Sequence, residues 1–205
     1  MAQTLKTEIN DRINDAALRV FFRKDYRSAK MSEIAREAGI SVGNIYRYYK
    51  NKEDLFYQII PPTQVSYIKR MLTKRIQAAH GKNDLNKLDQ EDQYWKIFKD
   101  QLKFMLEYRQ LLVILLSKSS GTVYENFKDE LIDLVKTLTR KYLISIGTSD
   151  VITSETDFTL GLIYNHLIDV IVKTLSNFSD KEKANLIIRK YFSFHLAGLK
   201  AFHEV

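Results

Sequence analysis

Residues 31–52 constrain the fold of this chain more than any other segment, because they predict two short helices joined by a tight turn. Ile34 and Ala38 are one helical turn apart and give the first helix an apolar face. Gly39 follows at the position where a helix often ends in a residue that accepts positive φ. Ser41 is then a good N-cap for the second helix, since its hydroxyl can accept from early backbone N–H groups.

The second helix of this segment has an inward and an outward side. Ile45 and Tyr49 are four residues apart and can both face the interior. The other side chains, which are small, polar or aromatic, lie mostly on the remaining faces: Val42, Asn44, Tyr46, Arg47 and Tyr48. This layout predicts a helix-turn-helix whose second helix enters the major groove of DNA.

The distribution of charge agrees with that prediction. The formal net charge is +7, which suits a polyanionic partner. Most of the excess lies in residues 22–52, where eight lysines and arginines stand against three acidic residues. These cations can displace counterions from phosphates. The alternative is a solvated basic surface, which is common in cytoplasmic proteins.

Composition limits the remaining possibilities. The chain has no cysteine, which excludes disulfides and thiolate chemistry. Its first residues lack the pattern of a signal peptide, and the longest aliphatic run, Leu111 to Leu116, is too short to cross a bilayer. We therefore expect a soluble, cytoplasmic protein.

Two prolines and seven glycines punctuate the 205 residues, and nearly every segment between them has a helical period, so the fold class is all-α. Pro61 and Pro62 predict a break between helices. Besides the helix-turn-helix and a helix that begins near Asn51, helices are expected over 6–24, 62–79, 93–107, 109–118, 122–146, 155–176 and 180–203. A polar loop is expected over 80–92. The predicted domains are 1–60, which contains the helix-turn-helix, and 61–205.

The last two predicted helices, 155–176 and 180–203, are apolar almost all round. Such helices are usually buried on more than one side. They predict either a twofold subunit interface or a pair buried inside one chain. Twofold pairing would also place two recognition helices on a palindromic site.

The chain resembles the TetR family of bacterial transcriptional repressors. The matching stretches are Arg12–Ala17, Phe21, Tyr26, Ile34–Ser41, Gly43–Tyr46, Tyr48–Tyr49 and Asn51–Phe56. The resemblance implies an N-terminal three-helix DNA-binding domain and a variable C-terminal helical domain. It further implies a homodimer on a palindromic operator, with a small-molecule ligand that moves the DNA-binding domains apart.

By this resemblance, the DNA contacts come from the second helix of the motif and its flanks. Arg47 could pair with a guanine edge and Asn44 with an adenine, while Lys52 is expected to contact a phosphate. Gly43 lets the backbone approach DNA closely. The full predicted set is Lys30, Ser41, Val42, Gly43, Asn44, Tyr46, Arg47, Tyr48 and Lys52.

Three positions depart from the family pattern. Ala29 and Lys30 occupy the place of a capping threonine or serine, so Lys30 supplies charge instead. Val42 replaces a common polar or basic residue and could contact a thymine methyl group. The break at Pro61 and Pro62 interrupts what is often one continuous helix, and we predict that it alters how ligand-driven motion reaches the DNA-binding domain.

A ligand cavity in the C-terminal domain is implied by the resemblance alone. Candidate lining residues are Tyr94, Trp95, Phe98, Phe104, Met105, Tyr124, Phe127 and Tyr164, although aromatic residues at helical spacing are more often plain core. Asn165, His166 and Asp169 interrupt an apolar helix and need polar partners. They could bind a ligand, bind one another or pair across a dimer.

Neither a metal site nor an enzyme active site is expected. His166, His195 and His203 are dispersed along the chain, with no cysteine or close carboxylate cluster to complete a site. No nucleophile–base pair or glycine-rich phosphate cradle is present, and no cofactor is implied. The sequence favours a ligand-responsive repressor. The alternative is a ligand-binding or interaction protein that no longer reads specific DNA.

Overall fold

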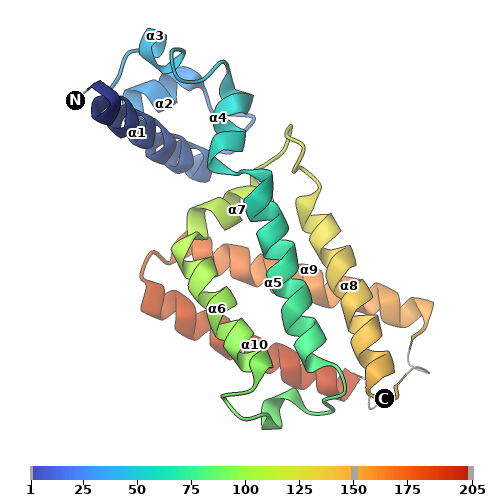
Figure 1. Cartoon of the computed structure of the whole chain (residues 1–205). Coiled ribbons are helices and arrows are strands. Elements are labelled where there is room, and N and C mark those ends of the chain that lie inside the picture. Colours follow the sequence, from blue (N-terminus) through green and yellow to red (C-terminus); the bar gives the residue numbers. More distant parts are fainter. Residues whose placement is uncertain (1, 149–151, 203–205) are drawn as a thin grey trace. The chain divides into compact units, whose positions relative to one another are not determined.

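The computed structural model describes residues 2–148 and 152–202, and every regular element in these ranges is helical (Figure 1). The all-α prediction is confirmed. The elements are α1 (Ala2–Arg23), α2 (Met31–Glu37), α3 (Val42–Ile45), α4 (Lys52–Ile59), α5 (Pro62–Ala79), a 3₁₀ turn (Leu85–Lys87), α6 (Gln93–Glu107), α7 (Arg109–Ser117), α8 (Phe127–Ser145), α9 (Ser154–Asn177) and α10 (Lys181–Phe202).

The chain divides into two compact units. The first, here called the head, comprises Met1–Val65 and Gln110–Phe127; the second, the body, comprises Ser66–Arg109 and Lys128–Val205. The predicted boundary after residue 60 lies close to Val65, where the chain first passes from the head to the body. The sequence did not predict that residues 110–127 belong to the same unit as the N-terminal helices.

The core of the head forms because the apolar stripe of α1 meets α2 and α4. Ile13, Phe21 and Ile34 are fully buried, as is Phe56 of α4. The rings of Phe21 and Phe56 meet edge to face with centroids 5.5 Å apart, and Tyr26 adds a third ring 4.9 Å from Phe56. These aromatic contacts fix the angle between α1 and α4.

The segment after α7 completes the head. The backbone N–H of Tyr26 donates to the Lys118 carbonyl at 2.9 Å, and the Lys118 ammonium returns a bond to the Phe22 carbonyl. The Val123 N–H donates to the Tyr57 hydroxyl at 3.2 Å. The helix expected from residue 122 begins only at Phe127, because residues 119–125 form turns.

The predicted break at the two prolines is present. α4 ends at Ile59, Ile60 leaves the helical region with φ −125° and ψ 72°, and α5 starts at Pro62. Proline suits the first position of a helix, where its missing N–H would have no intrahelical acceptor.

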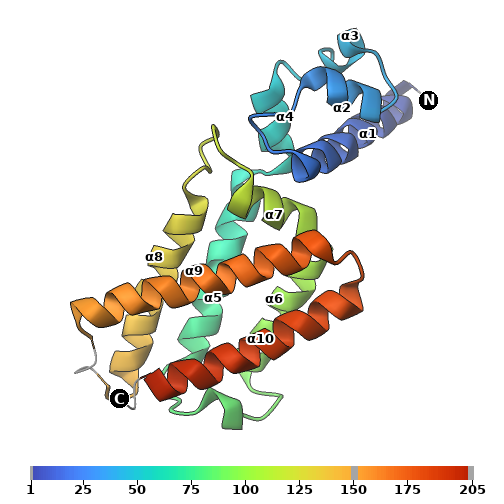
Figure 2. The same cartoon turned by 180° about the vertical axis from the view of Figure 1, so that it is seen from behind.

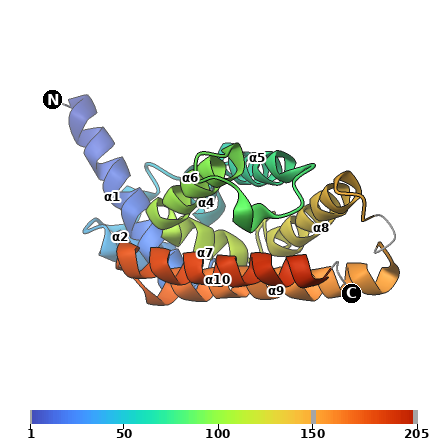
Figure 3. The ribbon, with the colours of Figure 1, turned by 90° about the horizontal axis from the view of Figure 1, so that it is seen from below.

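The body consists of two layers. α9 and α10 run antiparallel, side by side, and cover one face of α5, α6 and α8 (Figures 2 and 3). Buried leucines and isoleucines fill the space between the layers: Leu102, Leu138, Leu160, Leu175 and Ile188.

Several large apolar side chains of α9 and α10 are exposed. Phe158 and Phe194 are each 69% exposed, and Leu162 and Leu186 are more than half exposed. The interpretation of these helices as a pair buried inside one chain is therefore wrong. Among the described residues, α9 alone is long and apolar enough to cross a membrane, a test that core helices of soluble proteins also pass.

Candidate functional site

The turn between α2 and α3 forms as the sequence predicts. Gly39 adopts φ +66°. The Ile40 N–H donates to the Ala35 carbonyl at 3.0 Å and the Gly39 N–H to the Arg36 carbonyl at 3.1 Å, which is the Schellman pattern of a helix end. A guanidinium nitrogen of Arg12 on α1 also donates to the Gly39 carbonyl at 3.3 Å, so the turn is tied to the rest of the head.

The second helix is shorter than predicted. Ser41 caps it, with its hydroxyl accepting from the Asn44 N–H at 3.2 Å, but α3 ends at Ile45 and the chain continues in turns. Ile45 is fully buried and Tyr49 is 5% exposed, which confirms that both face inward. The Tyr49 hydroxyl is hydrogen bonded to the side chains of Asn10 and Asn14 of α1.

The side chains predicted to read DNA form the outer surface of this motif. Val42 is 43% exposed and Tyr46 52% exposed. Ser41, Gly43 and Arg47 are also exposed, while Asn44 and Tyr48 are half-buried. A methyl group added at Gly43 would meet nothing within 4 Å, so no packing inside the chain requires a glycine there.

Lys30 occupies the N-cap of α2 and is exposed. Its side chain makes no capping hydrogen bond, which is the departure that the sequence indicated. Glu33 supplies only the reverse half of a capping box, because its carboxylate accepts from the backbone N–H of the N-cap residue Lys30 at 3.2 Å. It also accepts from the Lys24 ammonium. These bonds lower the pKa of Glu33, the Lys24 bond most.

Lys52, the expected phosphate contact, has a structural role that sequence reasoning missed. Its ammonium donates to the carbonyls of Tyr26 at 2.7 Å, Ala29 at 2.9 Å and Arg27 at 3.3 Å, and lies 4.5 Å from the centroid of the Tyr26 ring. An ammonium has three donors, and here three carbonyls accept from them. Lys52 therefore closes the loop between α1 and α2, and no sequence signal indicates this.

The predicted ligand residues are divided between the two units. Tyr124 and Phe127 belong to the head, where Phe127 is buried and the Tyr124 ring packs against Tyr57. Trp95, Phe98, Met105 and Tyr164 belong to the body, as do Tyr94 and Phe104.

Asn165, His166 and Asp169 are not enclosed by the body. Asn165 and His166 are exposed. Asp169 accepts from the Lys128 ammonium at 2.6 Å and, at 3.5 Å, from the Asn165 amide. Two of the three thus contact each other, while the His166 ring lies 5.7 Å from that of Tyr191.

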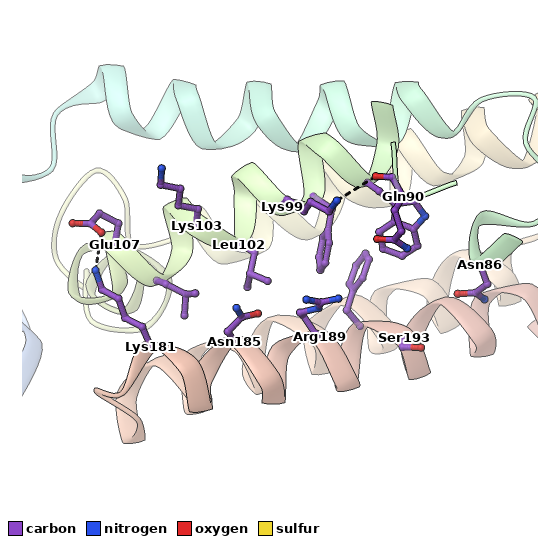
Figure 4. A pocket seen from close by; sticks show the side chains of 14 residues that line it. Asn86, Gln90, Lys99, Leu102, Lys103, Glu107, Lys181, Asn185, Arg189 and Ser193 are labelled. Carbon is purple, nitrogen blue, oxygen red and sulfur yellow. Dashed lines mark hydrogen bonds and ion pairs between the residues drawn. The ribbon is translucent and has the colours of Figure 1, made fainter. Parts of the chain in front are cut away.

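A cavity of about 610 Å³ lies between α6 and α10 of the body (Figure 4). Trp95 and Phe98, two of the predicted residues, line it together with Leu102, Leu106 and Phe192. Sequence reasoning missed its basic rim, which consists of Lys99, Lys103, Lys181 and Arg189. Glu107 is the acid beside them, and it pairs with Lys181 at 2.7 Å. The cavity therefore combines apolar walls with excess positive charge.

Within residues 2–148 and 152–202, no three histidine or carboxylate side chains come close enough to hold a metal ion. His203 lies outside the described residues.

A short stretch of the head is similar to known proteins. Residues 13–59 match the family described as bacterial regulatory proteins, tetR family. The fatty acid metabolism regulator protein of Bacillus subtilis is 39% identical over 59 residues, which are 29% of this chain and 30% of that protein. The transcriptional regulator AcrR of Shigella flexneri is 40% identical over 62 residues, 29% of each chain.

Similarity over more of the chain is weaker. The uncharacterized transcriptional regulator YvkB of Bacillus subtilis is 25% identical over 173 residues, covering 78% of this chain and 81% of that one. A TetR-like transcriptional regulator from Rhodococcus sp. RHA1 has the same fold, with a TM-score of 0.51, 20% identity, and coverage of 93% of this chain and 95% of that one. The match to the tetR family of bacterial regulatory proteins thus covers residues 13–59, which lie in the head.

Proposed function

We propose that this protein is a sequence-specific DNA-binding transcriptional regulator, a homodimeric repressor that leaves its operator when a small molecule binds. The observation that carries this proposal is the exposed surface of the helix-turn-helix, where Ser41, Tyr46 and Arg47 point away from a rigidly packed head. No observation favours the alternative of a protein that no longer recognises specific DNA.

Each exposed group has chemistry suited to DNA. The Arg47 guanidinium can donate two hydrogen bonds to a guanine edge, and the Asn44 amide can pair with adenine. Tyr46 offers a phenol to a phosphate and a ring to a thymine methyl group. Gly43 supports close approach to DNA because the chain itself gives no reason for a glycine there. Lys30, which makes no cap, supplies charge at the edge of this surface.

The exposed apolar side of α9 and α10 supports twofold pairing. Phe158, Leu162, Leu186 and Phe194 are all more than half exposed on this antiparallel pair of helices. Exposed large apolar side chains that lie near one another are typical of a protein interface. Leu162→Glu combined with Phe194→Glu should convert a dimer into a monomer in analytical ultracentrifugation. If the variant remains dimeric, the dimer interface does not lie on this side of α9 and α10.

The chain path supports a link between ligand and DNA. α6 lines the cavity and leads directly into residues 110–127, which belong to the head. There Lys118 bonds to both Phe22 and Tyr26 at the end of α1. Movement of α6 on ligand binding would act on the head through this segment.

The deciding experiment is fluorescence anisotropy of the full chain on DNA from upstream of its own gene, with scrambled competitor. Specific binding should be about 10³-fold tighter or more, and a dimer with about 6–10 phosphate contacts should lose about 10³–10⁵ in affinity between roughly 50 and 200 mM salt. Arg47→Ala should weaken specific binding, whereas Arg70→Ala, an exposed arginine of the body, should not. If a selection from random DNA also enriches no sequence, the proposal fails.

A further inference from the structure

Arg75 of α5 is a charged residue that is buried in the body. It is 9% exposed, and it occupies the apolar stripe of α5 between Leu72 and Ala79. Its guanidinium carbon lies 4.7 Å from the centroid of the Phe192 ring and 5.7 Å from that of Phe98. Aromatic rings therefore replace most of the water that would surround this charge.

The buried guanidinium has no counter-ion among the described residues. No carboxylate in residues 2–148 or 152–202 forms an ion pair with Arg75, and its Nε has no hydrogen-bond partner. Cation–π contacts to Phe192, Phe98 and Tyr94 offset only part of the desolvation. Arginine cannot lose its proton to escape this cost.

The neighbouring titratable groups do not supply a negative charge. Burial, and then the charge of Arg75, lower the pKa of His195 to about 4, so this histidine is neutral near pH 7. Burial raises the pKa of Tyr164 to about 12, and its hydroxyl shares a hydrogen bond with Thr139. Burial also raises the pKa of Tyr94. The interior therefore carries an uncompensated positive charge.

Two of the three rings around Arg75 also line the cavity between α6 and α10, and Arg75 itself lies behind that wall. Phe98 and Phe192 are stacked with centroids 4.2 Å apart, and both belong to the cavity wall. Two of the lining residues also carry a buried polar atom without a partner, Nε1 of Trp95 and Oδ1 of Asn185. A molecule with an apolar part would pack against these walls. An anionic group at its end would pair with the Arg75 guanidinium behind Phe98 and Phe192.

We propose that Arg75 binds the anionic end of the effector, and that the effector is an amphipathic carboxylate whose apolar part packs against Phe98 and Phe192. The proposal rests on the proposed ligand-responsive function and names the chemical class of its ligand. Binding opens the stacked pair of rings and so moves α6 relative to α10. A planar carboxylate matches the fork of the guanidinium, which donates two parallel hydrogen bonds.

Trp95, the single tryptophan of the chain, reports on this site because its ring lies 5.7 Å from that of Phe98. We would titrate the full chain with decanoate and 1-naphthoate, and with decanol and decyltrimethylammonium as neutral and cationic counterparts, below the concentrations at which they aggregate. A carboxylate should change the fluorescence and bind at least about 10-fold tighter than its counterparts. Binding of neither carboxylate, or equal binding of all probes, would overturn the proposal.

Variants separate an anion-binding role from a packing role. Arg75→Met should weaken carboxylate binding by about 30-fold or more and leave decanol binding unchanged. Its thermal midpoint without a probe should stay equal or rise, because methionine fills the space without a buried charge. Arg75→Lys should retain part of the preference for the anion. Arg70→Met, the same substitution at an exposed position of α5, should bind both probes like the native chain.

If Arg75→Met loses carboxylate and decanol binding equally, Arg75 serves packing alone and the proposal falls. The titration needs no DNA, so its failure is distinct from that of the proposed function. If the chain binds carboxylates but no specific DNA, the proposed Arg75 site stands and the proposed regulatory function fails. If the chain binds specific DNA but no carboxylate, the regulatory function stands and the proposed Arg75 site fails.

Discussion

The head and the body each contain a cation that is partly or fully shielded from water, and the two cations differ in their hydrogen-bond partners. Lys52 of the head is held by the carbonyls of Tyr26, Arg27 and Ala29, so each ammonium hydrogen has an acceptor. Arg75 of the body is more deeply buried and has aromatic rings in place of acceptors. A satisfied cation stabilises the fold that holds it, whereas an unsatisfied one is kept at a cost in stability.

This difference indicates what each unit is built for. In the head, internal carbonyls accept from the half-buried ammonium of Lys52, so the fold itself accounts for this cation. The body contains a charge that folding alone does not require. Proteins accept such a cost at binding sites, where the ligand completes the arrangement.

Acid should lower the free energy of unfolding of the body through protonation of His195. This is the largest effect on stability that we expect. Burial and the nearby charge of Arg75 lower its pKa from 6.5 to about 4, so the folded chain keeps it neutral while the unfolded chain binds a proton below pH 6.5. Its stabilising contribution is full above about pH 6.5 and is lost as the pH falls towards 4, with a total of about 3 kcal/mol. Urea unfolding followed by Trp95 fluorescence at several pH values measures it.

The variant His195→Gln provides the control, because glutamine does not titrate. Carboxylates throughout the chain also lose stability in acid, so the informative quantity is the difference between the native chain and this variant. If the two chains weaken in parallel between about pH 7 and about pH 4, the buried histidine has no part in the pH dependence.

Replacing the half-buried Lys52 should destabilise the head, whereas replacing the buried Arg75 should not destabilise the body. Lys52→Met leaves three carbonyls without their donor, and we expect a loss of about 2 to 3 kcal/mol because hydrogen bonds from charged groups are strong. Hydrogen exchange of the α1 and α4 amides measures this loss in the head. Arg75→Met should leave exchange in the body unchanged or slower. Equal destabilisation by both substitutions would remove the distinction between the two cations.

The sequence predicts the head well because its signals are local. Gly39, Ser41 and Asn51 each take the turn or capping role that their chemistry favours, and Asn51 accepts from the Asp54 N–H at 2.8 Å. The helices of the body are also close to their predicted bounds, since helical periodicity needs only near neighbours. The roles of the DNA-facing side chains remain predictions.

What the sequence could not show depends on residues that are distant along the chain. Lys118 joins the head through bonds to Phe22 and Tyr26, and nothing near Lys118 indicates them. The rings around Arg75 come from α6 and α10, so its burial follows from tertiary packing. One signal was available: Arg75 interrupts the apolar stripe of α5, where a leucine would be ordinary.

Within the head, the two glycines of the helix-turn-helix offer a finer comparison. Gly39 adopts φ +66°, and an added Cβ would lie 2.8 Å from a guanidinium nitrogen of Arg12. Gly39→Ala should cost about 1 to 2 kcal/mol, mainly from the left-handed backbone, because the Arg12 side chain can move. Hydrogen exchange of α2 measures the cost. Unchanged exchange would mean that the turn relaxes to another conformation.

Gly43→Ala should have the smallest effect on stability, and in the opposite direction. Its backbone is helical and an added methyl group meets nothing within 4 Å, so alanine should stabilise the head by about 0.5–1 kcal/mol. The same methyl group would stand between α3 and an approaching DNA backbone, so affinity for the selected DNA should fall. A more stable head that binds DNA less tightly would show that an external partner explains this glycine. A chain that gains stability and keeps its full affinity would place the DNA away from Gly43, and the contact surface would have to be redrawn around Tyr46 and Arg47.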